Sequence, residues 1–547
     1  MTQNDPESHR RPPHDAAAAQ DASLEPDAVE EGIAGPREVG HSAGAPQLGR
    51  KSPGLTDDGR FRSGRLKGLT MGSAIFLLAW PVTVESFLNS AVGLTDTWLA
   101  SQMGVAEADA IAGASYIMWF IGLTVMALGV GATALISRSV GASRMAVANA
   151  VLGQSVVLAL VLGSAVGVFI AVAASWVADL LNMGPEATAA FEQYMFIIAM
   201  GVPASSILFV LIACARGAGD SIRPLQAMAV RNIVNIAVSW ALSGIDLTVA
   251  AVDGSVRTIL ENPFGFDMGI AGIAIGTVAG DIAGAAIVFR MSLSGKWGIT
   301  LFRRRLKPHW ITVMRLVRLG VPNFLETLGM WVGNFIVIIF VGWMGAGLLG
   351  AHMIAIRIEA MSFLPGFAMG IAAATLAGQY LGARRPDLAK KAIMRCALIA
   401  AVIMGGLGAL FITIPETLTG LISTQEIHLE QTPHLLVICG VVQIPFALGI
   451  VLRQAMRGAG DVKVVMALTW ISTYLIRLPL AFFLSGVDIV WTREVDGELV
   501  RTVLLENPSP LEWGLTGLWV GLCIDLFMRG ALFTGRFIHG GWMKAKV

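Results

Sequence analysis

RGAGD stands at residues 216–220 and returns at residues 457–461, so the two copies are separated by 241 positions (457 − 216). Three further pairs keep this separation: Pro81-x-x-x-Glu85 with Pro322-x-x-x-Glu326, Met103-Gly104 with Met344-Gly345, and Gly141-Ala142-x-Arg144 with Gly382-Ala383-x-Arg385. The separation grows to 245 (506 − 261) where Glu261-Asn262-Pro263 matches Glu506-Asn507-Pro508. A constant separation over distant motifs predicts that the chain is an internal duplication.

Long apolar segments dominate both copies. Of the 547 residues, 55% are hydrophobic and only 14% are charged, whereas an ordinary soluble domain has about 25% charged residues. Many segments can cross a hydrocarbon layer of about 30 Å, which predicts about twelve membrane spans. Their expected limits are 70–99, 113–137, 149–178, 191–214, 224–243, 269–291, 316–343, 352–380, 392–414, 432–455, 463–485 and 513–535.

An even number of spans in each copy means that both copies enter the membrane in the same sense, as parallel repeats. We therefore expect an all-α membrane protein with twelve transmembrane helices in two six-helix lobes, at residues 66–300 and 301–547. The preceding segment, residues 1–65, is rich in Pro, Ala and acidic residues, which predicts a disordered cytoplasmic tail. Duplicated transporters bind substrate between or within such lobes, although a channel can be duplicated as well.

Lysine and arginine are concentrated in alternate loops, for example at 303–307 and 384–391, whereas the loops at 100–112, 179–190 and 415–431 contain none. Because basic loops stay in the cytoplasm, we expect a multi-pass plasma membrane protein (the inner membrane in a bacterium) with both termini cytoplasmic. A net charge of +1 argues against nucleic acid as a partner. We expect a monomer in the lipid bilayer.

Two outward segments carry a turn signal between β-rich runs. Asp253-Gly254 separates residues 247–252 from 255–260, and Asp496-Gly497 separates 489–495 from 498–504. Asp-Gly between such runs predicts a tight hairpin. We expect one small outward β-hairpin in each lobe, which either limits opening of the outer mouth or is a surface feature without a role.

Motifs of catalysis and nucleotide hydrolysis are missing from the sequence. It contains no GxxxxGK[ST], HExxH, nucleophile elbow or Cys/His metal cluster, so we expect neither an enzyme nor an ATP-driven pump. The four cysteines lie in or beside apolar segments without CxxC spacing, as is typical of packing residues.

The order of its motifs resembles that of the multidrug and toxin extrusion (MATE) transporters. The resemblance rests on WPVTVESFLNSAVGLTDTWLASQMG (80–104), ALISRSVGASR (134–144), ARGAGD (215–220), RNIVNI (231–236), GIAGIAIGT (269–277), GVPNFLETLG (320–329), RIEAMSFLPGFAMGIAAATLAGQYLGA (357–383) and IRLPLAFFL (476–484). It implies two six-helix lobes around a V-shaped cavity, from which organic cations leave in exchange for H⁺ or Na⁺.

The resemblance also implies a cation site in the first lobe. Asp96 stands in the family's V-D-T-like signature, and Asn235 and Thr277 match the Asn and Thr of its fifth and sixth spans. The second Asp of the family is Ser239 here, and two carboxylates would favour a hard cation more than one. Asp281, one turn beyond Thr277, is the candidate to supply that charge. We expect H⁺ or Na⁺ at this site, with Asp96, Asn235 and Thr277 as the Na⁺ ligands, and no other cofactor; alternatively, Asp96 caps a helix end.

Further polar residues of the spans are candidates for the substrate cavity, because ionisable side chains inside a bilayer are costly and usually functional. Glu85 and Asn89 share one helix face with Asp96 in the first span, because Asn89 follows Glu85 by four residues and Asp96 follows Asn89 by seven. The other candidates are Glu326, Met330, Arg357 and Arg477. Glu326, the repeat partner of Glu85, either pairs with Arg357 or Arg477 or exchanges protons directly.

These features lead to one main hypothesis and two alternatives. We expect an antiporter in which a proton or sodium ion enters at Asp96 and a small organic, cationic compound leaves. The first alternative is a flippase for lipid-linked sugars, which would need several Arg or Lys to bind phosphate. The second is a duplicated channel, disfavoured because no filter motif is found.

Overall fold

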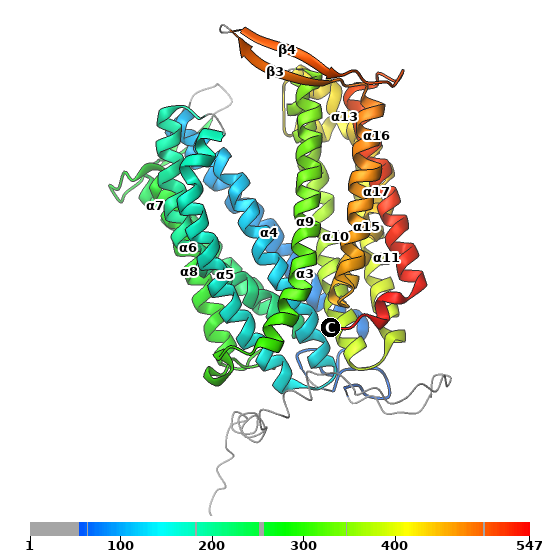
Figure 1. Ribbon diagram of the computed structural model, residues 1–547. Helices are drawn as coiled ribbons and strands as arrows, with labels where there is room; N and C mark the ends of the chain where they lie inside the picture. Colours follow the sequence, from blue (N-terminus) through cyan, green and yellow to red (C-terminus); the bar gives the residue numbers. More distant parts are fainter. Residues whose placement is uncertain (1–53, 63, 181–182, 251–255, 346, 496–497) are drawn as a thin grey trace, which may run out of the picture.

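The computed structural model describes residues 54–62, 64–180, 183–250, 256–345, 347–495 and 498–547 (Figure 1). The helices of the first half are α3 (Met71–Met103), α4 (Val105–Gly141), α5 (Met145–Leu180), α6 (Pro185–Gly217), α7 (Ile222–Ser243) and α8 (Gly269–Leu293). Those of the second half are α9 (Trp310–Met344), α10 (Leu348–Gly382), α11 (Pro386–Thr413), α12 (Pro415–Gly420), α13 (Glu426–Val441), α14 (Gln443–Gly458), α15 (Val462–Trp470), α16 (Leu478–Ser485) and α17 (Gly514–His539).

Most of these helices have the length and composition of membrane spans. Eleven helical segments of the described chain are long and apolar enough to cross a membrane. The number rises to twelve when α13 and α14, which are bent by 60° at a short break, are taken as one broken span. A mostly helical membrane protein with eleven or twelve spans agrees with the hydropathy of the sequence.

The two halves pack on each other in a reciprocal way. Helix α3 contacts α7 of its own half and α10 of the other half, and its repeat counterpart α9 contacts α15 of its own half and α4 of the other. Each of these two helices thus contacts the repeat counterparts of the helices that the other contacts, as a two-fold relation between the repeats requires. The two groups of helices diverge toward the end of the molecule that carries β3 and β4 (Figure 1).

At the opposite end, α4 and α10 cross closely through small residues. A Cβ atom on Gly141 would collide with the carbonyl oxygen of Gln379, and one on Gly382 would collide with that of Arg138. The same two polar side chains bind backbone of the opposite half: Arg138 donates to Ala459 O at 3.0 Å, and Gln379 Nε2 donates to Gly217 O at 3.1 Å. Gln379 is the repeat counterpart of Arg138 (379 − 138 = 241), so this crossing follows the duplication as well.

One local feature breaks the equivalence of the halves. Helix α7 is regular, whereas the corresponding segment of the second half contains a π-helical turn at Ile471–Arg477, between α15 and α16. Gly244 and Gly486 end the two segments with φ of 78° and 68°, and their separation is 242 (486 − 244). The π-helical turn therefore accounts for the first extra residue of the second copy, and such turns are frequent at functional sites.

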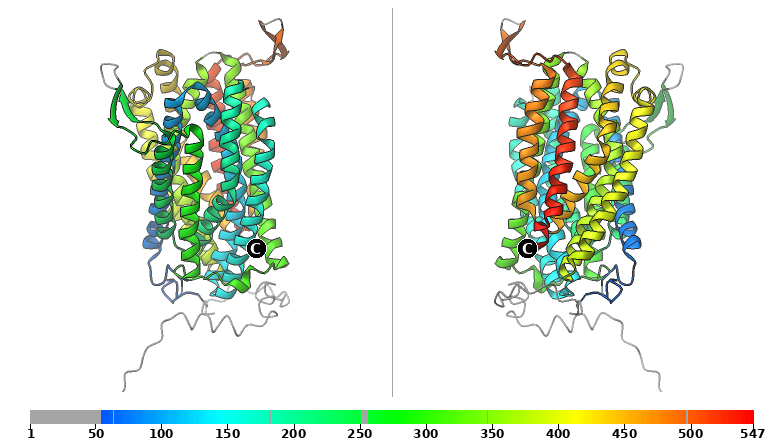
Figure 2. Two further views of the ribbon diagram at one scale, coloured as in Figure 1. Left: turned by 90° about the vertical axis from the view of Figure 1, so that its left-hand side faces the viewer. Right: turned by 90° about the vertical axis from the view of Figure 1, so that its right-hand side faces the viewer.

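Short strands connect the last two spans of each half. Strand β1 (Leu247–Ala250) pairs antiparallel with β2 (Val256–Leu260), and β3 (Ile489–Val495) pairs antiparallel with β4 (Glu498–Leu505). The predicted Asp253-Gly254 and Asp496-Gly497 turns lie outside the described residues. Figure 2 shows both strand pairs toward the end of the molecule opposite the C-terminus.

Residues just before α3 are folded against the helices. Leu55, Phe61 and Leu66 are buried, and Arg65 forms an ion pair with Asp220 at 3.2 Å. The sequence predicted a disordered tail up to residue 65, whereas the chain is packed from residue 55 onward; residues 1–53 lie outside the described part.

Candidate functional site

Three residues that the sequence singled out meet where α3, α7 and α8 adjoin. Asn235 Nδ2 donates a hydrogen bond to Thr277 Oγ1 at 3.0 Å, and both residues are buried. The half-buried Asp96 lies within interaction range of both side chains and of the Arg231 guanidinium. Asp96 Oδ1 and Asn235 Oδ1 are buried oxygens without a hydrogen-bond partner. A proton or a sodium ion would satisfy these acceptors, because both are bound by oxygen.

Close packing of α7 on α8 brings this cluster together. A Cβ atom on Gly276 would lie 2.5 Å from Ser239 N, and one on Gly280 would lie 2.7 Å from Arg231 O. Only glycine allows this approach of two helix backbones. Ser239 itself is buried and donates to Ile273 O at 3.3 Å, so its hydroxyl is directed to the backbone of α8.

The other carboxylates of the first half are paired with arginine. Asp281 Oδ1 accepts from Arg231 Nε at 2.8 Å, so its charge is already balanced, and Glu85 forms an ion pair with Arg216. Among Glu85, Asp96 and Asp281, Asp96 is thus the one without an arginine at ion-pair distance in the described structure. This leaves Asp96 as the group of the first-half spans best placed to bind an entering cation.

The predicted cavity residue Asn89 has a weaker contact. Asn232 Nδ2 lies 3.5 Å from Asn89 Oδ1, at the limit of a hydrogen bond. Because Arg231 also donates to Asn232 Oδ1 at 3.1 Å, Asn89 is connected through Asn232 to the arginine that balances Asp281.

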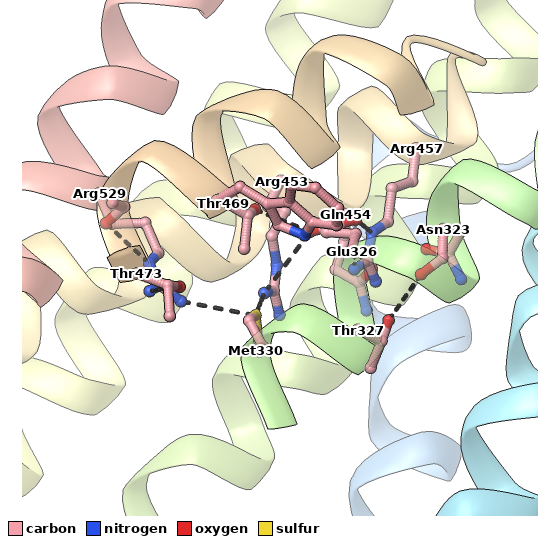
Figure 3. A network of polar contacts seen from close by, with 12 residues as sticks. Asn323, Glu326, Thr327, Met330, Arg453, Gln454, Arg457, Thr469, Thr473 and Arg529 are labelled. Atoms are coloured by element: carbon pink, nitrogen blue, oxygen red, sulfur yellow. Dashed lines mark hydrogen bonds and ion pairs between the residues drawn. The ribbon is translucent and has the colours of Figure 1, made fainter. Parts of the chain in front are cut away.

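In the second half, Glu326 is fully buried and is the centre of a network of polar contacts (Figure 3). Glu326 Oε2 accepts from Arg457 Nε at 3.0 Å and from Arg457 Nη2 at 2.8 Å, and Glu326 Oε1 accepts from Thr469 at 2.8 Å. The expectation that Arg357 or Arg477 pairs with Glu326 is therefore wrong. Glu326–Arg457 and Glu85–Arg216 are both separated by 131 residues, so the same ion pair is built twice.

Arg477 has a different partner. Its Nε and Nη2 atoms donate to Asp525 Oδ2, each at 2.8 Å, and Arg529 Nη2 donates to the same oxygen at 2.8 Å. Asp525 Oδ1 accepts from Ser472, a residue of the π-helical turn. Arg357 is not part of this network and is exposed on α10.

Two arginines of this network were not singled out from the sequence. Arg453 lies one turn before Arg457 on α14, and Arg529 lies one turn after Asp525 on α17. Both are at least nine-tenths buried and both direct an Nη1 atom at Met330 Sδ, at 2.8 and 3.6 Å (Figure 3). Their position inside membrane spans was the signal in the sequence that could have identified them, because a charged side chain there is costly and usually functional.

The duplicated RGAGD motif supplies one member of each buried pair and the turn that follows it. Arg216 and Arg457 contact the glutamates, and Gly219 and Gly460 adopt φ of 94° and 89°, which favours glycine. The terminal acids of the motif form ion pairs as well, Asp220 with Arg223 and Asp461 with Arg536. Within the described residues, no group of three or more His, Cys, Asp or Glu is arranged to hold a metal ion.

Comparison with known proteins finds relatives over most of the chain. The MatE family model matches residues 81–241 and 322–483, one match in each half. The probable multidrug resistance protein NorM of Thermotoga maritima is 24% identical over 476 residues, which covers 86% of this chain and 93% of the relative. The multidrug resistance protein PmpM of Pseudomonas aeruginosa is 23% identical over 473 residues, with coverage of 85% and 92%.

Solved structures share the fold. A crystal structure of MATE in complex with MaL6 has a TM-score of 0.74 at 18% identity and covers 87% of this chain and 97% of that one. A MOP superfamily transporter from Pyrococcus furiosus, for which a binding pocket of reverse polarity suggests a different function, has a TM-score of 0.73 at 19% identity with the same coverage. Because the family model matches more than half of the chain and both repeats, the protein belongs to the MatE family of multidrug and toxin extrusion membrane transporters.

Proposed function

We propose that the protein is a cation-coupled antiporter that exports small organic compounds across the plasma membrane of a bacterium. The observation that carries this proposal is the unpaired Asp96 beside Asn235 and Thr277, where two buried oxygens have no hydrogen-bond partner. Relatives named as multidrug resistance proteins support export of small molecules.

The coupling ion acts by changing the charge of the first half. With Asp96 ionised, a negative charge remains in a poorly solvated site, and a proton or Na⁺ neutralises it. Because Asp281 and Glu85 are balanced by Arg231 and Arg216, they keep their charges while Asp96 gains and loses its own. Loading of Asp96 is then the step that shifts the balance between two arrangements of the halves.

The orientation follows the distribution of basic residues. Both termini and the crossing of α4 and α10 lie on the cytoplasmic side in this proposal, and the strand pairs β1–β2 and β3–β4 form hairpins at the outer mouth. A cationic substrate, which the family resemblance implies, would need a carboxylate of its own. Asp96 is assigned to the coupling ion, so the charge of the substrate has to be judged from the second half.

The experiment is dye transport into inside-out vesicles under imposed proton or sodium gradients. The parent is run beside Asp96→Asn and beside Asp109→Asn, a matched control in which an exposed carboxylate at the start of α4 is changed. Two xanthene dyes of opposite charge are offered, rhodamine 6G and 5-carboxyfluorescein. We expect gradient-driven uptake of one of them in the parent and the control, and its loss in Asp96→Asn.

Two results would contradict the proposal. Transport that neither gradient changes would exclude antiport, and full gradient-driven transport by Asp96→Asn would exclude the assigned site. Binding of ²²Na⁺ to the purified protein, and displacement of the bound ²²Na⁺ by protons, are measured as well. These measurements distinguish a folded variant that is defective in coupling from a variant that has lost its fold.

A further inference from the structure

The buried network of the second half contains more guanidinium than carboxylate groups. Four arginines (Arg453, Arg457, Arg477 and Arg529) surround two acids, Glu326 and Asp525. A third carboxylate, Glu359, interacts with Arg477. Four guanidiniums and three carboxylates among the described residues leave an excess of positive charge in this network.

Both oxygens of each acid already accept hydrogen bonds, and Arg529 is one of the donors to Asp525. Both oxygens of Glu326 accept hydrogen bonds, from Arg457 and from Thr469, and Arg453 stands 3.9 Å from the nearer one. That distance is too long for a hydrogen bond. Asp525 accepts from Arg477 and Arg529 on one oxygen and from Ser472 on the other. Among the described residues, Arg453 therefore has no carboxylate within hydrogen-bond distance, whereas Arg529 is paired with Asp525 through Nη2 and its Nη1 atom does not bind either acid.

The Nη1 atoms of both arginines converge on one sulfur atom, while the Nε and Nη2 atoms of Arg529 donate to Ser472 and Thr473. Arg453 Nη1 and Arg529 Nη1 approach Met330 Sδ from α14 and α17 (Figure 3). A thioether is a weak acceptor and carries no charge, so it cannot compensate two guanidiniums. Met330 is half-buried, so this point of the network is partly exposed.

The first half has no such arrangement. At a separation of 241, Arg453 corresponds to Ile212 and Met330 corresponds to Asn89. At the separation of 245 that holds for the last span, Arg529 corresponds to Gly284 (529 − 284). The paired ions Glu85–Arg216 and Glu326–Arg457 are common to both halves, whereas Arg453 and Arg529 are additions in the second half alone. A requirement of the shared fold therefore does not explain these two arginines.

We propose that Arg453 and Arg529, on either side of Met330, bind the anionic group of the transported compound: a carboxylate, sulfonate or phosphate. This inference rests on the proposed export function and names its substrate class, an organic anion with an apolar body. Two guanidiniums give charge-assisted hydrogen bonds to an oxyanion, and the anion supplies the charge and the acceptors that Met330 does not. A purely structural role would place a carboxylate within hydrogen-bond distance of Arg453, as Asp525 is of Arg529, because an uncompensated buried charge is strongly unfavourable.

The test measures binding of 5-carboxyfluorescein to the purified full-length protein in phosphatidylcholine nanodiscs, by fluorescence anisotropy, with rhodamine 6G as the dye of opposite charge. In Arg453→Gln we expect the affinity for carboxyfluorescein to fall about 10- to 100-fold, the value of one or two charge-assisted hydrogen bonds. The matched control is Arg395→Gln, an exposed arginine of α11 in the same half, which should bind as the parent does.

A second variant guards against misfolding. Met330→Glu places a carboxylate between Arg453 and Arg529, so it completes the network and should raise thermal stability while it abolishes carboxyfluorescein binding. Nanodiscs with anionic phosphatidylglycerol distinguish a lipid headgroup from a soluble ligand. Competition by this lipid in the parent supports the anion site and assigns it to headgroups; no competition supports it as a site for soluble anions.

Three outcomes would overturn the inference: no saturable binding of carboxyfluorescein by the parent, undiminished binding by Met330→Glu, or tighter binding of rhodamine 6G than of carboxyfluorescein. None of these binding measurements uses an ion gradient or depends on Asp96, so failure of the anion site can be distinguished from failure of ion coupling. Gradient-driven transport of rhodamine 6G without binding of carboxyfluorescein would keep the antiport proposal and remove the anion site.

Discussion

Replacement of Glu326 by Gln should destabilise the protein more than replacement of its partner Arg457 by Met. Glu326 is fully buried and the Arg457 side chain is 3% exposed. Glu326→Gln leaves Arg457 without a counter-charge beside Arg453, and a guanidinium cannot become neutral in a protein. Arg457→Met leaves a carboxyl group that can bind a proton and that keeps Thr469 as a donor. The two members of one ion pair are therefore unequal.

The magnitude follows from the cost of breaking a buried ion pair, about 3–5 kcal/mol. Glu326→Gln belongs at the upper end, at about 4–5 kcal/mol, because two guanidiniums lose the same carboxylate. For Arg457→Met we expect about 1–3 kcal/mol, since the remaining carboxyl can be neutralised and stays hydrogen-bonded. In the double variant Glu326→Met with Arg457→Met, most of the loss should be recovered, because apolar replacement of both partners is often neutral.

The assay is the free energy of unfolding from SDS titration of the purified protein in mixed micelles. Glu85→Gln is the internal control, because its ion pair with Arg216 is more exposed, at 7% and 15% of the two side chains, and should cost less than its repeat counterpart Glu326→Gln. A loss for Arg457→Met equal to or larger than that for Glu326→Gln would refute the reasoning, because it would mean that the uncompensated guanidinium is not the dominant cost.

Two further predictions concern packing. Gly141→Ala should destabilise the protein by about 1–3 kcal/mol, because the added methyl group overpacks the α4–α10 crossing. Gly93→Ala is the control and should not destabilise the protein, because Gly93 has open space around it. Equal effects of the two substitutions in the same SDS titration would contradict the close approach of α4 and α10. Because the four cysteines are free and buried, a membrane-impermeant maleimide should label none of them in the native protein. After SDS denaturation it should label all four, as followed by mass spectrometry.

The helical membrane fold and its duplication could be predicted from sequence because both depend on local patterns. Apolar segments of span length and motifs at a fixed separation require no knowledge of tertiary contacts. The meeting of Asp96, Asn235 and Thr277 could also be expected, from the resemblance to a known family. The π-helical turn at 471–477 could not, because a single inserted residue in an apolar helix leaves no compositional signal.

The partners of the buried acids were the hardest part to predict. Arg216 and Arg457 stand near the ends of α6 and α14, where basic residues are typical of cytoplasmic loops, yet each contacts a glutamate 131 residues away. A signal was present, because an acid and a base at equal separation in both repeats predict a pair that the duplication has preserved. Arg357 is a different case: it is exposed on α10, which does not separate a side chain that faces a cavity from one that faces lipid, so its place in the substrate cavity stays a prediction.

The two proposed sites together suggest why one fold would carry opposite charges in its halves. The first half has a carboxylate, Asp96, without an arginine partner, and at the same place in the second half stands Val337 (337 − 96 = 241). The second half has Arg453, which stands 3.9 Å from its nearest carboxylate oxygen and whose Nη1 atom, like that of Arg529, meets only Met330 Sδ in the described part of the chain. In the two proposals, a cation neutralises Asp96 in the first half and an anion neutralises the guanidinium excess in the second, so the two ligands act on separate charges and do not compete for one side chain.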